Sequence, residues 1–289
     1  MNNKNLPPAP LPFRILRSIF PILETLLPFL ARFIVVRLFF TPFKFKPRAE
    51  EVEVQATGKR HDFKANGNNV VFHSWGNSGP IAVLVHGWSG RGMQLRKFVA
   101  PLQKQGYQVI SFDAPGHGAS EGKESSLLEI RATLIEIEKH FGEISMGVGH
   151  SLGGAAIIYS AKEGLHFDKI ITMSTPSIPD KIIDEFLRRI NGSIKSGIAI
   201  DNYVMKRTGN HFPYYSARDN AKHISHIPLL SFHDKNDREA EIEHAYALQK
   251  AHGKSELVVT EGLGHNRILK DEGVLEKALE FSISEKEFA

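Results

Sequence analysis

The chain carries a serine between two glycines at a point where its hydrophobic pattern changes. Residues 149–154 read Gly-His-Ser-Leu-Gly-Gly, and residues 143–148 before them are short and partly β-branched, as in a strand. Residues 154–162 after them are rich in Ala and Ile and favour a helix. A serine in such a strand-to-helix turn can present a nucleophilic hydroxyl clear of a sheet. Ser151 is therefore the first candidate catalytic residue, although an ordinary glycine-rich turn would have the same pattern.

Two further segments supply the groups that a serine nucleophile needs. A serine hydroxyl is a weak nucleophile near neutral pH, so an imidazole must take its proton and a carboxylate must orient that imidazole. The strand-like residues 228–232 lead into a loop that ends at Asp237, and residues 256–260 lead into a loop that ends at His265. Loops after strands form the site of an open α/β sheet. We therefore expect Ser151, Asp237 and His265 to meet at one edge.

A fourth segment can supply hydrogen-bond donors. Residues 81–85 (IAVLV) form a continuous apolar run, typical of a strand buried on both faces, and lead into His-Gly-Trp-Ser-Gly at 86–90. Acyl transfer places negative charge on the carbonyl oxygen, which fixed backbone N–H groups stabilise. Trp88 and Leu152 are the candidate donors. Residues 107–118 add another strand and tight loop at the same edge.

These four motifs, in this order, resemble those of the α/β-hydrolase superfamily over roughly residues 50–289. The resemblance implies that Ser151 is the nucleophile, Asp237 the acid and His265 the general base, with the backbone N–H groups of Trp88 and Leu152 as the oxyanion hole. The chain departs from the family where His-Gly often precedes the acid-bearing loop, because His233 is followed by Asp234. Asp234 is therefore a rival for Asp237, and the family spacing favours Asp237.

The remaining segments fit an α/β fold. A further strand is predicted at 169–173, and helices are predicted at 94–105, 125–141, 239–251 and 271–283. Ser125 and Gly142 are expected to cap the helix over 125–141. Strands that alternate with helices indicate a mostly parallel central sheet flanked by helices. We assign residues 49–289 to this α/β-hydrolase domain.

About fifty residues separate the strand that ends near Ser174 from the strand that begins at Pro228, too many for a plain connection. We expect a small, mostly helical cap insertion over about 178–226 that lies above Ser151 and selects the substrate. Its helices are predicted at 178–190 and 195–206. Several apolar and aromatic residues either line an acyl pocket or simply pack: Phe186, Leu187, Tyr203, Phe212, Tyr214 and Tyr215.

Residues 1–48 form an N-terminal extension of different composition. The first fifty residues contain eight Lys or Arg against two Glu, a balance of +6, whereas the whole chain is +4 and the rest therefore −2. The basic pI of about 9.1 reflects this segment, and no nucleic-acid partner is implied. Residues 13–43 are apolar, but Glu24, Arg32 and Arg37 break them into runs shorter than the roughly 20 residues that span a bilayer.

Helical periodicity makes this extension amphipathic, with a wide apolar surface and a thin polar strip that includes Pro21 and Pro28. Three interpretations compete. Residues 13–43 attach peripherally to an anionic membrane, pack on the hydrolase body or a dimer partner, or act as a secretory signal. Glu24 and the lack of an Ala-x-Ala site weigh against the signal.

Together these patterns predict a cytoplasmic serine hydrolase, free or peripheral to the membrane, that cleaves carboxylic esters of a small molecule or lipid through an acyl-enzyme. Thioesterase, amidase and carbon–carbon hydrolase activities stay open, as does a non-catalytic member that binds a lipid or partner. The chain has no cysteine, which excludes thiol catalysis and thiolate metal sites. Its 14 histidines contain no His-Glu-x-x-His or comparable set, so neither a metal nor another cofactor is expected.

Overall fold

The computed structural model describes residues 11–284, which divide into two compact units. Of these described residues, the smaller unit combines residues 11–40 with residues 178–215, and the larger unit contains residues 41–177 and 216–284. Helices of the predicted extension therefore share a unit with helices of the predicted cap, a grouping that hydrophobic periodicity does not predict. Residues 1–10 of the predicted extension and residues 285–289 lie outside the described part of the chain.

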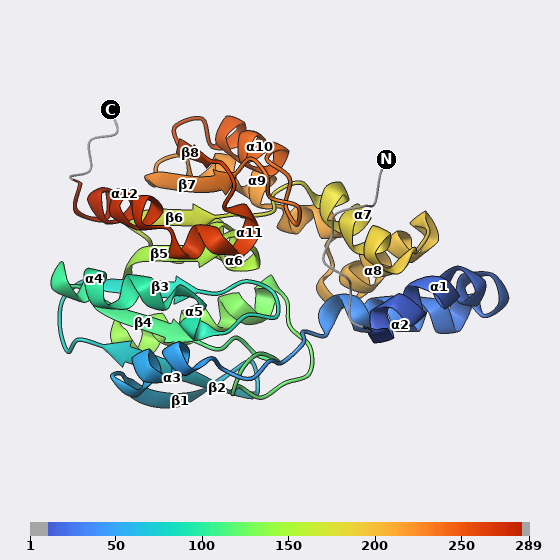
Figure 1. The fold of residues 1–289 in the computed structure, drawn as a ribbon, viewed down its shortest axis with the longest axis horizontal. Coiled ribbons are helices and arrows are strands. Elements are labelled where there is room, and N and C mark those ends of the chain that lie inside the picture. The colour runs from blue at the N-terminus through green and yellow to red at the C-terminus, as the bar shows by residue number, and fades with distance from the viewer. Residues whose placement is uncertain (1–10, 285–289) are drawn as a thin grey trace. The chain divides into compact units, whose positions relative to one another are not determined.

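The larger unit is built on an eight-stranded sheet in the order β1-β2-β4-β3-β5-β6-β7-β8 (Figure 1). Strands β3 to β8 run parallel to one another, whereas β2 is antiparallel to both β1 and β4. The predicted mostly parallel sheet is thus confirmed. The strands are β1 Lys59–Ala65, β2 Asn68–Trp75, β3 Ile81–Val85, β4 Gln108–Phe112, β5 Ile144–His150, β6 Lys169–Met173, β7 Leu229–Asp234 and β8 Glu256–Thr260.

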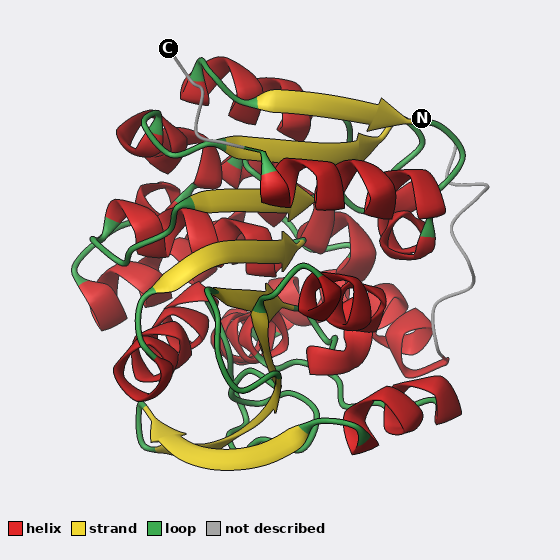
Figure 2. Cartoon of the chain, turned by 90° about the vertical axis from the view of Figure 1, so that its left-hand side faces the viewer, coloured by secondary structure: helices red, strands yellow, loops and turns green. Residues whose placement is uncertain are grey.

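Helices cover both faces of this sheet (Figure 2). One face carries α5, α6, α9 and α10, and the other carries α4, α12 and the short helices η1 and η4. The helices of this unit are α3 Ala49–Ala56, η1 Gly92–Phe98, α4 Val99–Lys104, α5 Leu127–Phe141, α6 Leu152–Lys162, α9 Ala217–Ala221, η3 Lys222–Ile224, α10 Glu243–His252, α11 Gly264–Arg267, η4 Ile268–Lys270 and α12 Glu272–Ile283.

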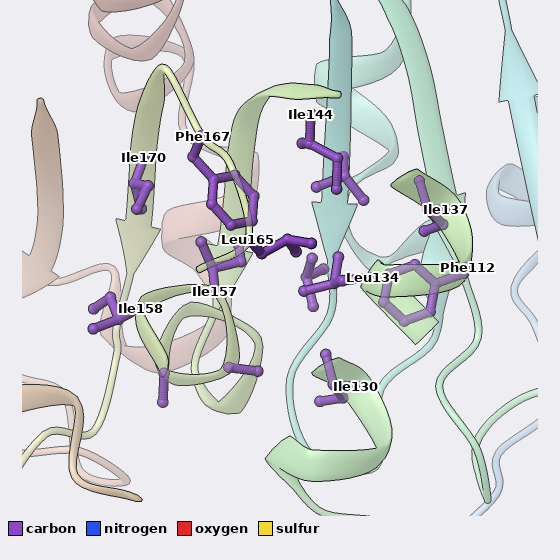
Figure 3. Close-up of a cluster of buried hydrophobic side chains, with 14 of the residues drawn as sticks. Phe112, Ile130, Leu134, Ile137, Ile144, Ile157, Ile158, Leu165, Phe167 and Ile170 are labelled. Atoms are coloured by element: carbon purple, nitrogen blue, oxygen red, sulfur yellow. The ribbon is translucent and has the colours of Figure 1, made fainter. Parts of the chain in front are cut away.

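The core consists of two apolar clusters, one on each face of the sheet. Successive residues of β3 alternate between them: Val83 and Val85 belong to one cluster, and Leu84 belongs to the other. On the first face, Leu134 of α5 and Ile157 of α6 pack with their buried neighbours (Figure 3). Each fully buried aliphatic side chain contributes about 1.5–3 kcal/mol. This packing fixes the strand ends that carry the candidate site.

Two details of the predicted helices are corrected. The helix expected over 94–105 begins as the 3₁₀ helix η1, has non-helical backbone at Leu95, and continues as α4, where Pro101 lies in the first turn and removes no helical bond. Ser126, not Ser125, caps α5, because the Ser126 hydroxyl accepts a hydrogen bond from the Leu128 N–H at 3.1 Å. Gly142 ends α5 as expected, with φ 105°.

The smaller unit contains four longer helices, α1 Leu11–Leu26, α2 Pro28–Phe40, α7 Pro179–Ile190 and α8 Ile194–Thr208, and the short η2 Phe212–Tyr215. Helices α1 and α2 are separated directly before Pro28, whose nitrogen cannot donate a helical bond. Helix α1 contacts α7, and α2 contacts α8.

Three of the aromatic residues considered for an acyl pocket pack on α2. The ring of Phe39 lies 4.9 Å from that of Phe186 and 5.7 Å from that of Phe212, and Phe40 lies 5.1 Å from Tyr203, measured between ring centroids. The inserted part of this unit ends at Tyr215, before the predicted cap boundary near 226. Residues 217–224 belong to the larger unit and not to the insertion, because Ala217, Ala221 and Ile224 are buried in the core of the larger unit.

Candidate active site

Ser151 occupies a strained turn between β5 and α6. Its backbone has φ 50° and ψ −122°, a region that residues other than glycine rarely adopt. The Ser151 N–H donates to the carbonyl of Met173 at 2.8 Å. A Cβ added to Gly149 would lie 2.5 Å from Cα of Gly154, and one added to Gly153 would lie 2.3 Å from the carbonyl oxygen of Val85. Both glycines are therefore required by close packing.

The structure brings His265 and Asp237 together. Nδ1 of His265 lies 2.8 Å from Oδ2 of Asp237, whose Oδ1 accepts the N–H groups of Glu239 and Ala240 at 2.8 and 3.0 Å. Burial raises the pKa of Asp237, but the hydrogen bond and charge of His265 and the two backbone donors outweigh it, so the net pKa is lowered. An ionised Asp237 keeps the proton of His265 on Nδ1, which makes Nε2 the basic nitrogen.

The rival carboxylate, Asp234, holds the loop that carries His265. Oδ2 of Asp234 accepts the hydroxyl of Thr260 at 2.8 Å and the N–H of Leu263 at 2.9 Å, and Oδ1 accepts the N–H of Asn236 at 2.9 Å. Burial raises the pKa of Asp234, but these hydrogen bonds lower it below its ordinary value. The hydrogen bond to the imidazole of His265 is thus made by Asp237, while Asp234 fixes the backbone beside it.

The loop after β3 lies against the Ser151 turn. A Cβ added to Gly87 would lie 2.9 Å from Cβ of Ser151. The loop therefore lies so close to the serine that only glycine fits at position 87. The N–H of Gly87 donates to the side-chain oxygen of Gln94 at 3.0 Å. Trp88 belongs to this loop, and Leu152 opens α6, in the first turn where helical N–H groups have no partner within the helix. The two candidate oxyanion donors therefore lie on adjoining segments.

Two buried histidines brace this loop. Nδ1 of His86 donates to the carbonyl of Gly87 at 2.7 Å, and Nε2 accepts the N–H of Ala114 at 2.9 Å. Nε2 of His117 accepts the N–H of Ser89 at 3.1 Å, where the Ser89 φ of 54° marks a sharp bend. Burial lowers the pKa of His86, and it lowers the pKa of His117 to about 3. Both rings are neutral at physiological pH, which lets each serve as donor and acceptor.

His150 contacts the backbone of His265, a contact that the sequence did not reveal. Its Nε2 lies 2.8 Å from the carbonyl oxygen of His265, and the two rings are 4.8 Å apart between centroids. His150 is buried, and this burial lowers its pKa to about 3. The neutral ring donates through Nε2 and holds the residue that Asp237 orients. The sequence feature that could have pointed to His150 is its position directly before Ser151, at the end of a strand.

Comparison with known proteins identifies the family. A family model described as the alpha/beta hydrolase family matches residues 82–277. The chain belongs to this family. The matched segment runs from β3 to α12, and it includes Ser151, Asp237, His265 and both candidate oxyanion donors.

Solved structures show the same fold. This alpha/beta hydrolase is similar to an esterase of Pyrococcus furiosus, with a TM-score of 0.62, 18% identity, and coverage of 84% of this chain and 96% of that one. It is also similar to a bacterial membrane phospholipase A, with a TM-score of 0.62, 15% identity, and coverage of 93% and 98%. At these identities the likeness concerns the fold alone.

Curated relatives match over shorter segments. Protein phosphatase methylesterase 1 of Mus musculus is 27% identical to this alpha/beta hydrolase over 124 residues, which are 40% of this chain and 30% of the relative. An uncharacterized hydrolase, YugF, of Bacillus subtilis is 28% identical over 126 residues, 42% of this chain and 46% of the relative. The chain thus spans less than half the length of the curated relatives it matches.

Proposed function

We propose that this alpha/beta hydrolase is a serine hydrolase that cleaves carboxylic esters through an acyl-enzyme intermediate. The observation that carries the proposal is the pairing of Nδ1 of His265 with the ionised Asp237. The backbone carbonyl of His265 also contacts His150, the residue directly before a serine held at positive φ. A binding protein has no need of a strained serine together with an oriented base. The esterase and phospholipase structures of the same fold support an ester as the substrate class.

In the proposed reaction, Nε2 of His265 takes the proton of the Ser151 hydroxyl while Oγ attacks the ester carbonyl carbon. The carbonyl oxygen becomes an oxyanion, stabilised by the N–H groups of Trp88 and Leu152. The tetrahedral intermediate collapses, the C–O bond breaks, and the leaving alkoxide takes the proton from His265. Water then gives its proton to His265 and attacks the acyl-enzyme, which releases the acid and restores Ser151.

Pre-steady-state kinetics test the proposal. With excess p-nitrophenyl acetate, the full-length protein should release a burst of p-nitrophenol equivalent to the enzyme present, followed by slower turnover. Ser151→Ala should abolish the burst, and mass spectrometry should find one acetyl group on the Ser151 peptide of the quenched parent protein. Turnover without an acetylated peptide would overturn the acyl-enzyme mechanism, and absence of any turnover on esters would favour a binding role. Matched acetyl thioester and anilide substrates separate the ester preference from thioesterase and amidase activities.

A further inference from the structure

Helices α1 and α2 direct a stripe of large apolar side chains toward solvent. Phe29 is 85% exposed, Leu26 is 72% exposed and Phe33 is 61% exposed. At about 100° per residue the stripe falls within an arc of about 100° and continues across the break before Pro28. Its members are Ile15, Ile19, Ile22, Leu26, Phe29, Leu30 and Phe33, which we call the outer stripe.

The opposite side of the same helices is fixed by packing within the smaller unit. Phe20, Ala31 and Val35 are buried on this side. Glu24 lies among them and accepts hydrogen bonds from the N–H of Ser193 at 3.0 Å, the hydroxyl of Ser193 at 2.9 Å, and the hydroxyl of Ser196. Ser193, the N-cap residue of α8, makes no side-chain cap of its own, so Glu24 caps this helix from α1. Turning the outer stripe inward would break this cap.

The charges around the outer stripe are of one sign. Arg14 and Arg32 are exposed and lie at the same angular position on one edge of the stripe, and Arg37 lies on its extension. Glu24 is the single acidic residue in residues 11–40, and its carboxylate is used by Ser193 and Ser196. An apolar stripe edged with arginines is the arrangement of helices that lie in a membrane interface, where basic side chains reach the lipid headgroups.

We infer that the outer stripe docks on the surface of an anionic phospholipid bilayer, with α1 and α2 lying in the interface. Among the helices that the structure describes, none has the length and apolar character that crossing a bilayer requires. A second copy of this chain fits less well, because a two-fold contact through the stripe would bring like-charged arginines together. The inference does not depend on the proposed ester hydrolysis, since vesicle binding is measured without any substrate.

Vesicle co-sedimentation tests this inference on the full-length protein. Vesicles of phosphatidylcholine with one-third phosphatidylglycerol should bind the protein, and pure phosphatidylcholine vesicles should bind it at least tenfold more weakly. Each basic residue near an anionic surface contributes about fivefold, so Arg14→Gln with Arg32→Gln should weaken binding about twenty-five-fold. Leu26→Ser with Phe29→Ser should weaken it by more than tenfold. Because these four side chains are exposed, circular dichroism should report unchanged helix content.

Matched variants in the larger unit provide the controls. Lys64→Gln with Lys104→Gln removes two exposed charges, and Val259→Ser with Ile283→Ser removes two exposed apolar side chains. Neither pair should change vesicle binding by more than twofold. Equal binding to both vesicle types, or equal losses from the control pairs, would overturn the inference. A protein that ignores vesicles but dimerises, and becomes monomeric in Leu26→Ser with Phe29→Ser, would assign the stripe to a second copy instead.

Discussion

The carboxyl edge of the sheet and the outer stripe of α1 and α2 are built on opposite principles. At the sheet edge, two acidic side chains are buried and paired: both oxygens of Asp237 and both oxygens of Asp234 accept hydrogen bonds. On the outer stripe, apolar side chains such as Phe29 are exposed, and the polar Glu24 lies on the opposite side of α1, where it bonds to Ser193. A buried polar group without a partner costs about 1–3 kcal/mol, and exposed apolar area is also unfavourable in water. Both regions therefore depart from the ordinary pattern, and we propose that the first serves chemistry and the second serves association.

The difference shows how each region responds to change. The sheet edge is fixed by hydrogen bonds that a single substitution can break, so catalysis there should be sensitive to the loss of one atom. The outer stripe consists of side chains that contribute little to the fold, so substitutions there should change association and leave the structure intact.

The largest effect is expected at the serine and its base. Ser151→Ala and His265→Ala should each lower kcat/KM for p-nitrophenyl esters by about 10⁴-fold or more, because the members of a catalytic triad act as a unit. The double variant should lose no more than either single variant. Urea denaturation should show that the fold is retained, and additive losses in the double variant would contradict a shared mechanism.

The next largest effect is a difference in kcat between variants of the two carboxylates. Asp237→Asn should lower kcat by about 10²- to 10⁴-fold, because the asparagine favours the wrong tautomer of His265. Asp234→Asn keeps the acceptor oxygen of its loop and should lower kcat about tenfold or less while it destabilises the protein by about 1–2 kcal/mol. Steady-state kinetics and urea denaturation measure the two effects. A larger kcat loss in Asp234→Asn would show that the acid has been misassigned.

Acid should destabilise the buried histidines at the sheet edge. Burial lowers the pKa of His150 and of His117 to about 3, whereas an unfolded histidine titrates near 6.5. Above pH 6.5 neither state binds the proton, and between 6.5 and about 3 only the unfolded chain does. The free energy of unfolding should therefore decrease as the pH is lowered through this window, by up to about 1.4 kcal/mol per pH unit for each histidine.

Urea denaturation at pH 7.5, 6 and 5 measures this slope. His117→Asn should flatten it, whereas His223→Asn, which changes an exposed histidine, should not. A slope that His117→Asn leaves unchanged would show that this ring is not held neutral in the fold.

A smaller effect is expected for the contact between His150 and the backbone of His265. His150→Phe keeps a ring but removes the Nε2–H donor, and should lower kcat about tenfold, consistent with the loss of one hydrogen bond. Because His150 acts as a positioning residue, KM should change little, and His150→Gln, which can still donate, should recover part of the rate. If Phe and Gln variants lose activity equally, the contact serves packing alone.

The smallest effect is expected where α1 caps α8. Glu24→Gln keeps an acceptor but loses the charge, and should destabilise the protein by about 0.5 kcal/mol, while Glu24→Ala should cost about 1 kcal/mol. Thermal unfolding measures both. A stabilised Glu24→Ala protein would show that the carboxylate does not hold the two helices together.

Much of the site could be predicted from sequence because its residues follow strand ends. Ser151 comes directly after strand β5, whereas Asp237 and His265 lie in the loops that follow β7 and β8, and parallel strands place such positions at one edge. The contacts of Asp234 and His150 could not be predicted, because nothing in a sequence tells which oxygen or ring nitrogen meets which loop carbonyl.

The elements that escaped prediction lack a local pattern. Strand β1 is largely polar and exposed, so the alternation that marks a half-buried strand is weak. The cap of α8 joins Glu24 to Ser193 across 169 residues of sequence. Such long-range pairs depend on how separate helices pack, which hydrophobic periodicity does not encode.

Fluorophosphonate labelling of the folded, full-length protein tests the central claim most directly. Such a probe phosphonylates a serine only where a base activates the hydroxyl. We expect one equivalent of probe on the peptide that contains Ser151, no labelling in Ser151→Ala, and labelling slowed by at least a hundredfold in His265→Ala. Labelling of another serine in the folded protein, or no labelling of Ser151, would contradict the account.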